Sequence, residues 1–325
     1  MTQLRGATLV TGGAGFIGSH LVDLLLARDE QVVVLDDFND FYEPAWKWRN
    51  LGCARGRRGF HLLRGDVRDP EAVMAALRAA GEPVRRVVHL AARAGIQPSL
   101  VDPTLYADVN VTGTAVVLEA CRKAEVEGVV VASSSSVYGA DRGTPFTEEE
   151  PADCPVSPYA ATKRANELQC WTFHHLTGIP VSCLRFFTAY GPRNRPDMAV
   201  YKFGRAISAG AEIVMYGEGV ERDFTYVGDV VAGVAAAWER DNGYLLCNLG
   251  SGRPVPVAGL IQGLEKVLGR RGRVSRAPLP PGDVPITWAS TERARRALGW
   301  TPGTSLEEGL ARFAEWYAET GVTAA

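Results

Sequence analysis

The chain of 325 residues has few lysines, little net charge and no long apolar run. Its 35 cationic side chains are 30 arginines and only 5 lysines, and 37 acidic side chains bring the net charge to −2. Without a basic excess, the chain has no field that would hold a nucleic-acid backbone. No apolar segment approaches the ~20 residues that a membrane span needs. We therefore expect the chain to bind neither nucleic acid nor a membrane.

Cysteine and histidine are also scarce, and neither shows the spacing of metal ligands. The 6 cysteines include no Cys-x-x-Cys pair, and two of the 5 histidines are the adjacent His174 and His175. We therefore expect no metal site and no redox motif. Residues 1–13 lack the charged segment, the long apolar segment and the cleavage site of a secretory leader. The sequence thus predicts a cytoplasmic protein with reduced thiols.

Strand-like and helix-like patterns alternate through the first two thirds of the chain. Short apolar runs typical of buried strands lie at 7–11, 31–35, 86–91, 128–132 and 181–186. Helical patterns lie between them, at 18–27, 70–80, 106–124 and 158–176. Continuous apolar strands that alternate with helices predict an α/β fold, a Rossmann-type doubly wound parallel sheet.

The C-terminal third has a different texture, with more Gly, Pro and Arg and shorter segments. We assign residues 1–190 to the sheet domain and residues 191–325 to a smaller mixed α/β domain. The two are expected to interleave, because 245–250 again resembles a core strand and should return to the sheet. A last amphipathic helix is predicted over 306–318, capped by Thr304 or Ser305.

A glycine loop follows the first predicted strand. Residues 11–18 read TGGAGFIG, which places G-x-G-x-x-G between a strand and a helix. Absent side chains let the backbone approach a pyrophosphate, and the helix N-terminus supplies N–H groups. Asp36 ends the second strand, where a carboxylate accepts hydrogen bonds from ribose hydroxyls and repels a 2′-phosphate. The pattern predicts NAD rather than NADP, bound by Gly12, Gly15, Phe16, Ile17, Gly18 and Asp36.

A second acidic residue follows the third predicted strand. Asp66 and Val67 stand where an adenine contact is expected, just before the helical pattern that begins at Pro70. The alternative is that Asp66 caps that helix.

Tyr159 and Lys163 are spaced to share one face of a helix. Ser157 and Pro158 provide the N-cap and the first helical position. An ammonium and a positively charged nicotinamide both favour the phenolate, so we expect the pKa of Tyr159 to be lowered and Tyr159 to act as a general base. Hydroxyls at 133–136 follow a core strand and should face the ligand crevice. The alternatives are an exposed Tyr–Lys pair and a polar turn.

These motifs together resemble the extended short-chain dehydrogenase/reductase family, from about residue 4 to 317. Within it, the chain is similar to the nucleotide-sugar 4-epimerases, above all to the UDP-glucuronate 4-epimerases. Besides the glycine loop, the motifs that carry the resemblance are LAARAG (90–95), NVTGT (110–114), SSSSVYG (133–139), YAATK (159–163), RFFTAYGPRNRPDMA (185–199) and RDFTYVGD (222–229).

The resemblance implies a role for each candidate residue. Tyr159 would take the proton of the sugar 4-hydroxyl while NAD accepts the C4 hydride, Ser134 would orient that hydroxyl, and Lys163 would hold the nicotinamide ribose. The 4-keto sugar would turn about its diphosphate and take the hydride back on its other face. Further cofactor contacts implied by the resemblance are Asn39, Leu90, Ala91, Ala92, Arg93 and Asn110.

The resemblance also implies contacts to the nucleotide of a UDP-sugar. Arg222 would bind the diphosphate, Asp283 the uridine ribose, and Tyr216 would stack on uracil. The alternative for Tyr216 is a core aromatic residue. Many relatives form homodimers through the helices expected at 106–124 and 158–176, so a homodimer is expected here. Residues for its face are Leu168, Trp171, His174 and His175, and the alternative is that they are core or solvated.

The residues after Ser134 reduce the number of reactions that the resemblance allows. Related dehydratases and decarboxylases carry acidic residues there, whereas this chain has Ser135 and Ser136. Elimination of water would lack its acid and base catalysts. A 4-keto intermediate made from a glucuronate loses CO₂ unless its carboxylate is restrained. Candidates to bind that carboxylate are Ser135, Ser136, Thr188 and Arg195, with Met198 lining the same site.

This pattern favours the UDP-glucuronate 4-epimerase branch of the family. UDP-glucose/galactose 4-epimerases usually have Asn where Thr188 stands and a bulkier aromatic near Thr287. A UDP-hexose 4-epimerase and a UDP-glucuronate decarboxylase remain alternatives, as does a non-catalytic NAD-binding sensor. Arg195 could also be a surface or diphosphate contact.

Overall fold

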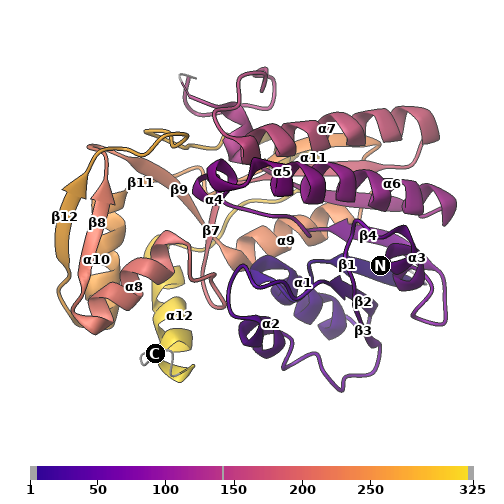
Figure 1. Ribbon diagram of the computed structural model, residues 1–325, viewed down its shortest axis with the longest axis horizontal. Coiled ribbons are helices and arrows are strands. Elements are labelled where there is room, and N and C mark those ends of the chain that lie inside the picture. Colours follow the sequence, from indigo (N-terminus) through magenta and orange to yellow (C-terminus); the bar gives the residue numbers. More distant parts are fainter. Residues whose placement is uncertain (1–5, 141–142, 321–325) are drawn as a thin grey trace.

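The computed structural model describes residues 6–140 and 143–320. Figure 1 shows a parallel sheet between two layers of helices and, at the other end of the molecule, a smaller part of short strands and helices. Within the described ranges, no helix combines the length and the apolar character needed to cross a bilayer. The prediction that no leader begins the chain falls partly on residues 1–5, which lie outside these ranges.

Seven strands of the described residues form one sheet in the order β10-β6-β5-β4-β1-β2-β3, and each neighbouring pair is parallel. Their bounds are β1 (Ala7–Thr11), β2 (Gln31–Asp36), β3 (Phe60–Arg64), β4 (Val84–His89), β5 (Gly128–Ser134), β6 (Val181–Phe186) and β10 (Tyr244–Leu249). The predicted Rossmann-type fold is confirmed. The strand order reverses beside β1 and β4, where a crevice opens at the carboxyl ends of the strands.

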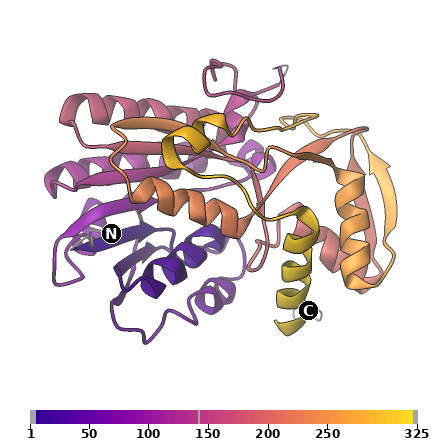
Figure 2. The same cartoon turned by 180° about the vertical axis from the view of Figure 1, so that it is seen from behind.

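Both faces of the sheet are buried, which explains why its strands are apolar without alternation. In β1, Leu9 packs into the core under one helical layer and Val10 into the core under the other. Figure 2 shows α1 and α9 lying side by side across one face. That layer contains α1 (Phe16–Ala27), α2 (Pro44–Asn50), α9 (Val227–Trp238) and α11 (Glu292–Leu298). The opposite layer contains α3 (Pro70–Ala76), α6 (Gly113–Lys123) and α7 (Pro158–Thr177).

Helix α7 begins and ends where its sequence requires. The Ser157 hydroxyl accepts a hydrogen bond from the Ala160 N–H at 3.2 Å, Pro158 opens the helix, and Gly178 closes it in the left-handed conformation. Short helical turns flank this layer at α4 (Ile96–Val101), α5 (Pro103–Tyr106), η1 (Ala107–Thr112) and η2 (Ser135–Tyr138). Tyr159 and Lys163 are thus fixed in the first two turns of a long helix packed on the sheet.

The smaller part is built from two small sheets and helices that cover them. Its strands are β7 (Thr188–Tyr190), β9 (Glu221–Tyr226) and β11 (Pro254–Pro256) in one sheet, with β8 (Glu212–Tyr216) and β12 (Arg273–Ala277) in the other. Its helices are α8 (Ala199–Ala209), α10 (Val257–Leu268) and α12 (Leu306–Glu319), the last beside α10 in Figure 2. The predicted final helix is confirmed, and Ser305 is its N-cap.

The chain passes between the two parts several times. Strand β6 continues through Phe187 into β7, and β9 runs directly into α9. Strand β10 lies beside β6 at the edge of the large sheet. Side chains of α8, α10 and α12 belong to the same buried cluster as those of α1 and α9. The two parts therefore share one hydrophobic core, which fixes the walls of the crevice between them.

Candidate active site

A cavity of about 620 Å³ lies at the carboxyl ends of the sheet strands and extends to the smaller part. The sheet contributes the loops that follow β1, β2, β3, β4 and β5, and the smaller part contributes the opposite wall. The predicted site residues that line it are Gly12, Gly15, Phe16, Ile17, Gly18, Asp36, Asn39, Asp66, Val67, Leu90, Ala91, Ala92, Arg93, Ser134, Ser135, Ser136, Tyr159, Lys163, Thr188, Arg195, Met198, Arg222 and Asp283. Residues that are far apart in the sequence thus meet in one space.

The glycine loop leaves no room for side chains at two positions. Gly12 has φ +69°, and a Cβ there would lie 2.7 Å from the Ala91 nitrogen. A Cβ at Gly18 would lie 2.2 Å from the Gly12 carbonyl oxygen. The loop is therefore drawn tight against β4 and α1, and the N-terminus of α1 borders the cavity. This geometry fits a pyrophosphate bound by backbone N–H groups.

Asp36 is held in one orientation at the end of β2. Its carboxylate accepts hydrogen bonds from the Ala14 N–H at 3.0 Å and the Phe38 N–H at 2.9 Å. Burial raises the pKa of Asp36, and the Lys47 ammonium, 3.9 Å away, acts in the opposite direction. Lys47 also lines the cavity and was not among the predicted residues. The sequence held one signal that could have pointed to Lys47 as a site residue, namely that the chain has only 5 lysines.

Asp66 does not cap the helix that follows it. The N-cap of α3 is Asp69, whose side chain accepts from the Glu71 N–H at 2.9 Å. Asp66 instead borders the cavity and receives the Arg68 guanidinium, with Nη2 at 2.5 Å from Oδ2. The hydrogen bonds from Arg68 lower the pKa of Asp66. The capping alternative is therefore wrong, and Asp66 remains available to a ligand as a charged, oriented acceptor.

Asn110 braces the cavity wall from behind rather than lining the cavity. Its amide accepts from the Arg93 N–H at 2.8 Å and donates to the Arg93 carbonyl oxygen at 3.0 Å and to the Thr162 hydroxyl at 3.0 Å. The side chain is fully buried. The structure therefore gives Asn110 an indirect part, because it fixes the turn after β4 against α7.

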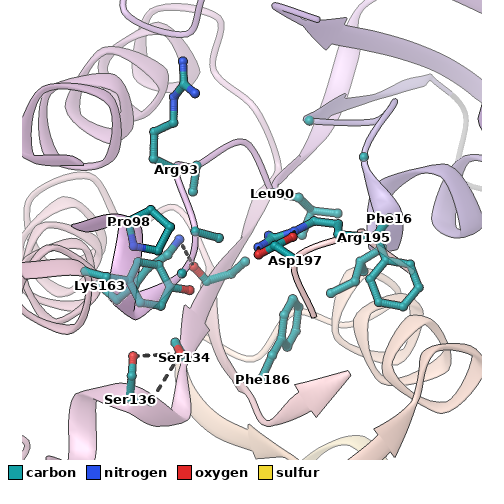
Figure 3. A pocket seen from close by; sticks show the side chains of 18 of the residues that line it. Phe16, Leu90, Arg93, Pro98, Ser134, Ser136, Lys163, Phe186, Arg195 and Asp197 are labelled. Carbon is teal, nitrogen blue, oxygen red and sulfur yellow. Dashed lines mark hydrogen bonds and ion pairs between the residues drawn. The ribbon is translucent and has the colours of Figure 1, made fainter. Parts of the chain in front are cut away.

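Ser134, Tyr159 and Lys163 converge where β5 ends against α7. The Lys163 Nζ donates to the Ala132 carbonyl oxygen at 2.9 Å. The Ser134 hydroxyl oxygen accepts from the Ser136 N–H at 3.2 Å and from the Ser136 hydroxyl at 2.9 Å, the contacts dashed in Figure 3. A phenol, an ammonium and a hydroxyl in one cavity are the groups needed for proton transfer to or from a substrate alcohol.

The pKa of Tyr159 differs in direction from the expectation. Burial raises it, while hydrogen bonding with Ser134 and the positive charge of Arg195 lower it. The Lys163 ammonium is turned to the Ala132 carbonyl, so it adds little at the phenol. The predicted lowering thus requires a further positive charge beside the ring, the part that the nicotinamide was expected to play.

Arg195 and Asp197 form an ion pair inside the cavity. The Arg195 Nε and Nη2 donate to the two Asp197 carboxylate oxygens at 2.9 and 2.6 Å. Figure 3 shows the two side chains turned toward each other. Sequence reasoning selected Arg195 but missed Asp197, although it lies only two residues away. The fork of the guanidinium is therefore already matched to a carboxylate in this structure.

Arg222 and Asp283 also face each other across the cavity wall. Their closest atoms, Nη2 and Oδ1, lie 2.7 Å apart. Burial lowers the pKa of Arg222, and Asp283 acts in the opposite direction. Tyr216 is not near them: it lies on the outer face of β8, its side chain is 48% exposed, and it is not part of the cavity lining. The structure therefore does not support a stacking role for Tyr216.

Comparison with known proteins places these features in a family. The model of the GDP-mannose 4,6-dehydratase family matches residues 9–313. A UDP-glucuronate 4-epimerase of Thermodesulfobacterium geofontis is 38% identical over 97% of this chain and 97% of its own length.

Solved structures agree with this assignment. The UDP-glucuronic acid 4-epimerase of Bacillus cereus, in complex with UDP-glucuronic acid and NAD, has a TM-score of 0.90 at 32% identity, covering 97% of this chain and 99% of its own. The UDP-glucose 4-epimerase of Thermus thermophilus, in complex with NAD, has a TM-score of 0.86 at 33% identity, covering 96% and 99%.

Proposed function

Because this chain belongs to the extended short-chain dehydrogenase/reductase family, in the branch of NAD-dependent nucleotide-sugar 4-epimerases, we propose that it interconverts UDP-glucuronate and UDP-galacturonate. The observation that carries the choice of substrate is the lining of the cavity beside Tyr159. There, Ser135, Ser136 and Thr188 offer hydroxyls and Arg195 offers a guanidinium, without an acidic residue directly after Ser134.

The residues of the cofactor half fit NAD. The glycine loop has no room for side chains at Gly12 and Gly18, and Asp36 presents a fixed carboxylate to a ribose. Leu90, Ala91, Ala92 and Arg93 would line the cofactor beyond β4. When bound, NAD supplies a reversible acceptor for the hydrogen and electron pair at the sugar C4 carbon.

We propose that Tyr159 removes the proton of the sugar 4-hydroxyl and returns it in the reverse step. Ser134 would hold that hydroxyl by a hydrogen bond, since its own oxygen is fixed by Ser136 at the end of β5. Lys163 would hold a ribose hydroxyl with its ammonium, which is anchored by the Ala132 carbonyl. Proton transfer by a positioned phenol accelerates such a reaction by about 10²- to 10⁴-fold.

The nucleotide would be bound from the smaller part. Arg222 would bind the diphosphate and Asp283 the uridine ribose, and each is already oriented by the other. An anionic diphosphate competes with Asp283 for the same guanidinium, so binding would rearrange this pair.

The uronate carboxylate would be bound by Ser135, Ser136, Thr188 and Arg195, beside Met198. A carboxylate held by a guanidinium and hydroxyls keeps its charge, which disfavours loss of CO₂ from the ketone. A dehydratase, the activity that names the family model, would need an acid and a base near C5 and C6. The neighbours of Ser134 in sequence are serines, and this supports epimerisation instead.

The test is ¹H NMR of the purified protein with UDP-glucuronate and no added reductant. UDP-galacturonate as the sole product is the expected result. UDP-xylose or a 4-keto pentose would make the protein a decarboxylase and overturn the serine argument. Turnover of UDP-glucose alone would make it a UDP-hexose 4-epimerase, the second candidate, and absence of turnover with bound NAD would favour a sensor.

We further propose a cytoplasmic homodimer. Leu168 and Trp171 on α7 are 53% and 51% exposed, and Leu176 follows on the same helix, so this layer presents apolar surface that a second copy would cover. All six cysteines are free thiols, in keeping with a reducing compartment. Light scattering of the protein and of Trp171→Glu tests the dimer: a monomeric wild type would refute it.

A further inference from the structure

One carboxylate of helix α7 is buried without being part of the cavity lining. Glu167 stands one helical turn after Lys163, and its side chain is 0% exposed. Arg185 on β6, 1% exposed, binds it through two contacts: Nε to Oε1 at 2.8 Å and Nη2 to Oε2 at 2.9 Å. The Ser133 hydroxyl donates to Oε1 at 2.6 Å, and Arg164 donates to Oε2 at 2.9 Å.

A buried ion pair of this kind adds little net stability to a fold. Two buried charges lose their hydration, and apolar residues of similar volume often stabilise a protein as well or better. Here the carboxylate is fully hydrogen-bonded, and the Arg185 guanidinium also lies over the Tyr138 ring, 4.6 Å from its centroid. The arrangement is rigid, and its position beside the reacting groups suggests a use beyond stability.

Helix α7 is tied to the end of β5 at two points one turn apart. Lys163 donates to the Ala132 carbonyl and Glu167 accepts from the Ser133 hydroxyl. Tyr159, one turn before Lys163, lines the same cavity as Ser134, and hydrogen bonding with Ser134 lowers the pKa of Tyr159. Glu167 thus fixes the strand residue that lies between the Lys163 anchor and Ser134.

We propose that Glu167 is a positioning residue for the Tyr159–Lys163–Ser134 group. Held by Arg185, it locks the end of β5 against α7 so that Ser134 stays within reach of the phenol. It also places a permanent negative charge one turn from the Lys163 ammonium.

The charges around Lys163 explain why this second effect matters. Burial lowers the pKa of Lys163 to about 8, while Cys170, Cys183 and Glu167 act in the opposite direction. The Cys183 thiol is neutral, because its neighbour Cys170 and burial raise its pKa. His89 on β4 is also neutral, because burial lowers its pKa to about 3. Glu167 is the carboxylate among these groups and favours the protonated form of Lys163, with Arg185 bound to Glu167 and the Tyr159 phenol one turn before Lys163.

Activity is expected to depend on pH through the protonation of Lys163. Lys163 loses its proton as the pH rises through its pKa, so activity that needs the ammonium declines at alkaline pH. Without the negative charge of Glu167, the ammonium is less favoured and the decline begins at lower pH. If Glu167 served folding alone, its loss would lower the stability of the protein. The decline of activity at alkaline pH, the alkaline limb of the pH profile, would then stay at the wild-type pH.

The experiment compares four variants with the wild type, using whichever UDP-sugar the wild type epimerises. Glu167→Gln leaves Arg185 buried and unpaired, so the double variant Glu167→Gln/Arg185→Met, which removes both charges, is made beside it. Ser133→Ala removes only the link to β5. Arg164→Gln is the matched control, since it removes a partly exposed partner of the same carboxylate. The measurements are kcat and KM from pH 6 to 10, NAD content and the thermal midpoint.

We expect the double variant to fold and retain NAD, with kcat reduced about tenfold or more and KM unchanged. The alkaline limb should move to lower pH in Glu167→Gln and by less in the double variant, because Arg185→Met also removes the positive charge that opposes Glu167. Ser133→Ala should reduce kcat severalfold without moving the limb, and Arg164→Gln should match the wild type. Glu167→Gln with the wild-type pH profile would overturn the electrostatic role, and wild-type kcat in Ser133→Ala would overturn the positioning role.

This inference rests on the proposed chemistry of Tyr159 but not on the identity of the sugar. Absence of wild-type turnover on any UDP-sugar contradicts the proposed function before a variant is compared. Wild-type turnover with an unaltered Glu167→Gln/Arg185→Met contradicts the inference alone.

Discussion

The two sides of the cavity use the same kind of ion pair in different ways. Beneath helix α7, Glu167 and Arg185 are sealed from solvent, with side chains 0% and 1% exposed. In the cavity wall, the pairs Arg195–Asp197 and Arg222–Asp283 retain between 15% and 31% exposure. The first pair has no path to a ligand, whereas the other two have their guanidinium groups at the cavity surface.

Burial decides which of these pairs is able to exchange partners. Opening a sealed pair leaves two uncompensated charges in a low-dielectric interior, so the pair is fixed. Opening a pair at a cavity surface costs much less, because solvent or an anionic ligand replaces the lost partner. A carboxylate beside an arginine is thus part of the scaffold on one side of the cavity and, under the proposed function, occupies the place of the substrate's anionic groups on the other.

The largest expected effect lies on the fixed side, at the reacting group itself. Tyr159→Phe should reduce kcat by about 10²-fold or more, because the general base is lost. NAD content should stay at the wild-type level, since the ring still fills its place. The measurement is the initial rate by NMR with NAD content of the same sample. A variant that keeps a tenth of the rate would remove Tyr159 as the base.

The next largest effect should appear on the exchangeable side and depend on the sugar. Arg195→Ala should reduce kcat/KM for UDP-glucuronate by about 10- to 100-fold, the loss of a charge-assisted hydrogen bond to a carboxylate. The loss with UDP-glucose should be severalfold at most. Both ratios come from the same coupled measurement of product formation, and equal losses would refute contact with the carboxylate.

Asp197→Asn should act in the opposite direction. It frees the Arg195 fork, so the KM for UDP-glucuronate should fall a few-fold while that for UDP-glucose hardly changes, because only the uronate competes with Asp197. Titration calorimetry with both sugar nucleotides is the check. Weaker binding of both sugars alike would mean that the Arg195–Asp197 pair belongs to the scaffold, as Glu167–Arg185 does.

The smallest effect is expected for the pair that joins the two sides. Arg193, two residues before Arg195, forms an ion pair with Asp23 on α1, with Nη2 2.7 Å from Oδ2. The neighbouring Pro192 carbonyl oxygen lies 2.9 Å from Nε2 of His20, which is also on α1. Asp23→Asn should raise the KM for UDP-glucuronate and the loss of NAD on gel filtration by about two- to fourfold.

The matched control for Asp23→Asn is Arg28→Gln, which breaks the Arg28–Glu239 pair at the other end of α1. It should leave both quantities unchanged. An equal change in the two variants would assign the effect to α1 stability rather than to the loop that carries Arg195.

Local patterns predicted the sheet side of the site well, because each of its elements is short-range. The glycine loop joins a strand to a helix within 8 residues, and Tyr159 and Lys163 meet across one turn of α7. The roles assigned to these residues stay predictions, yet their meeting in one cavity is observed.

The predicted positions of site residues were wrong where residues distant in sequence decide which way a side chain faces. Asn110 was expected at the cofactor but is buried between Arg93 and Thr162, and Tyr216 was expected at uracil but faces outward from β8. For Tyr216, the alternation along β8, which buries Ile213 and Met215 and exposes Glu212, was a local signal that the prediction did not use. Lys47 was missed because only the folded chain brings it to Asp36, whereas Asp197 was missed although it lies two residues from Arg195.

By itself, the sequence determined the parallel sheet, the glycine loop and the spacing of the Tyr–Lys pair, because these follow from apolar periodicity, missing side chains and the pitch of a helix. Tertiary structure alone decided which charges are sealed and which are free to exchange, and whether the Tyr159 pKa is raised or lowered. Those properties depend on burial and on groups brought together by folding, and no local pattern encodes the dielectric around a side chain.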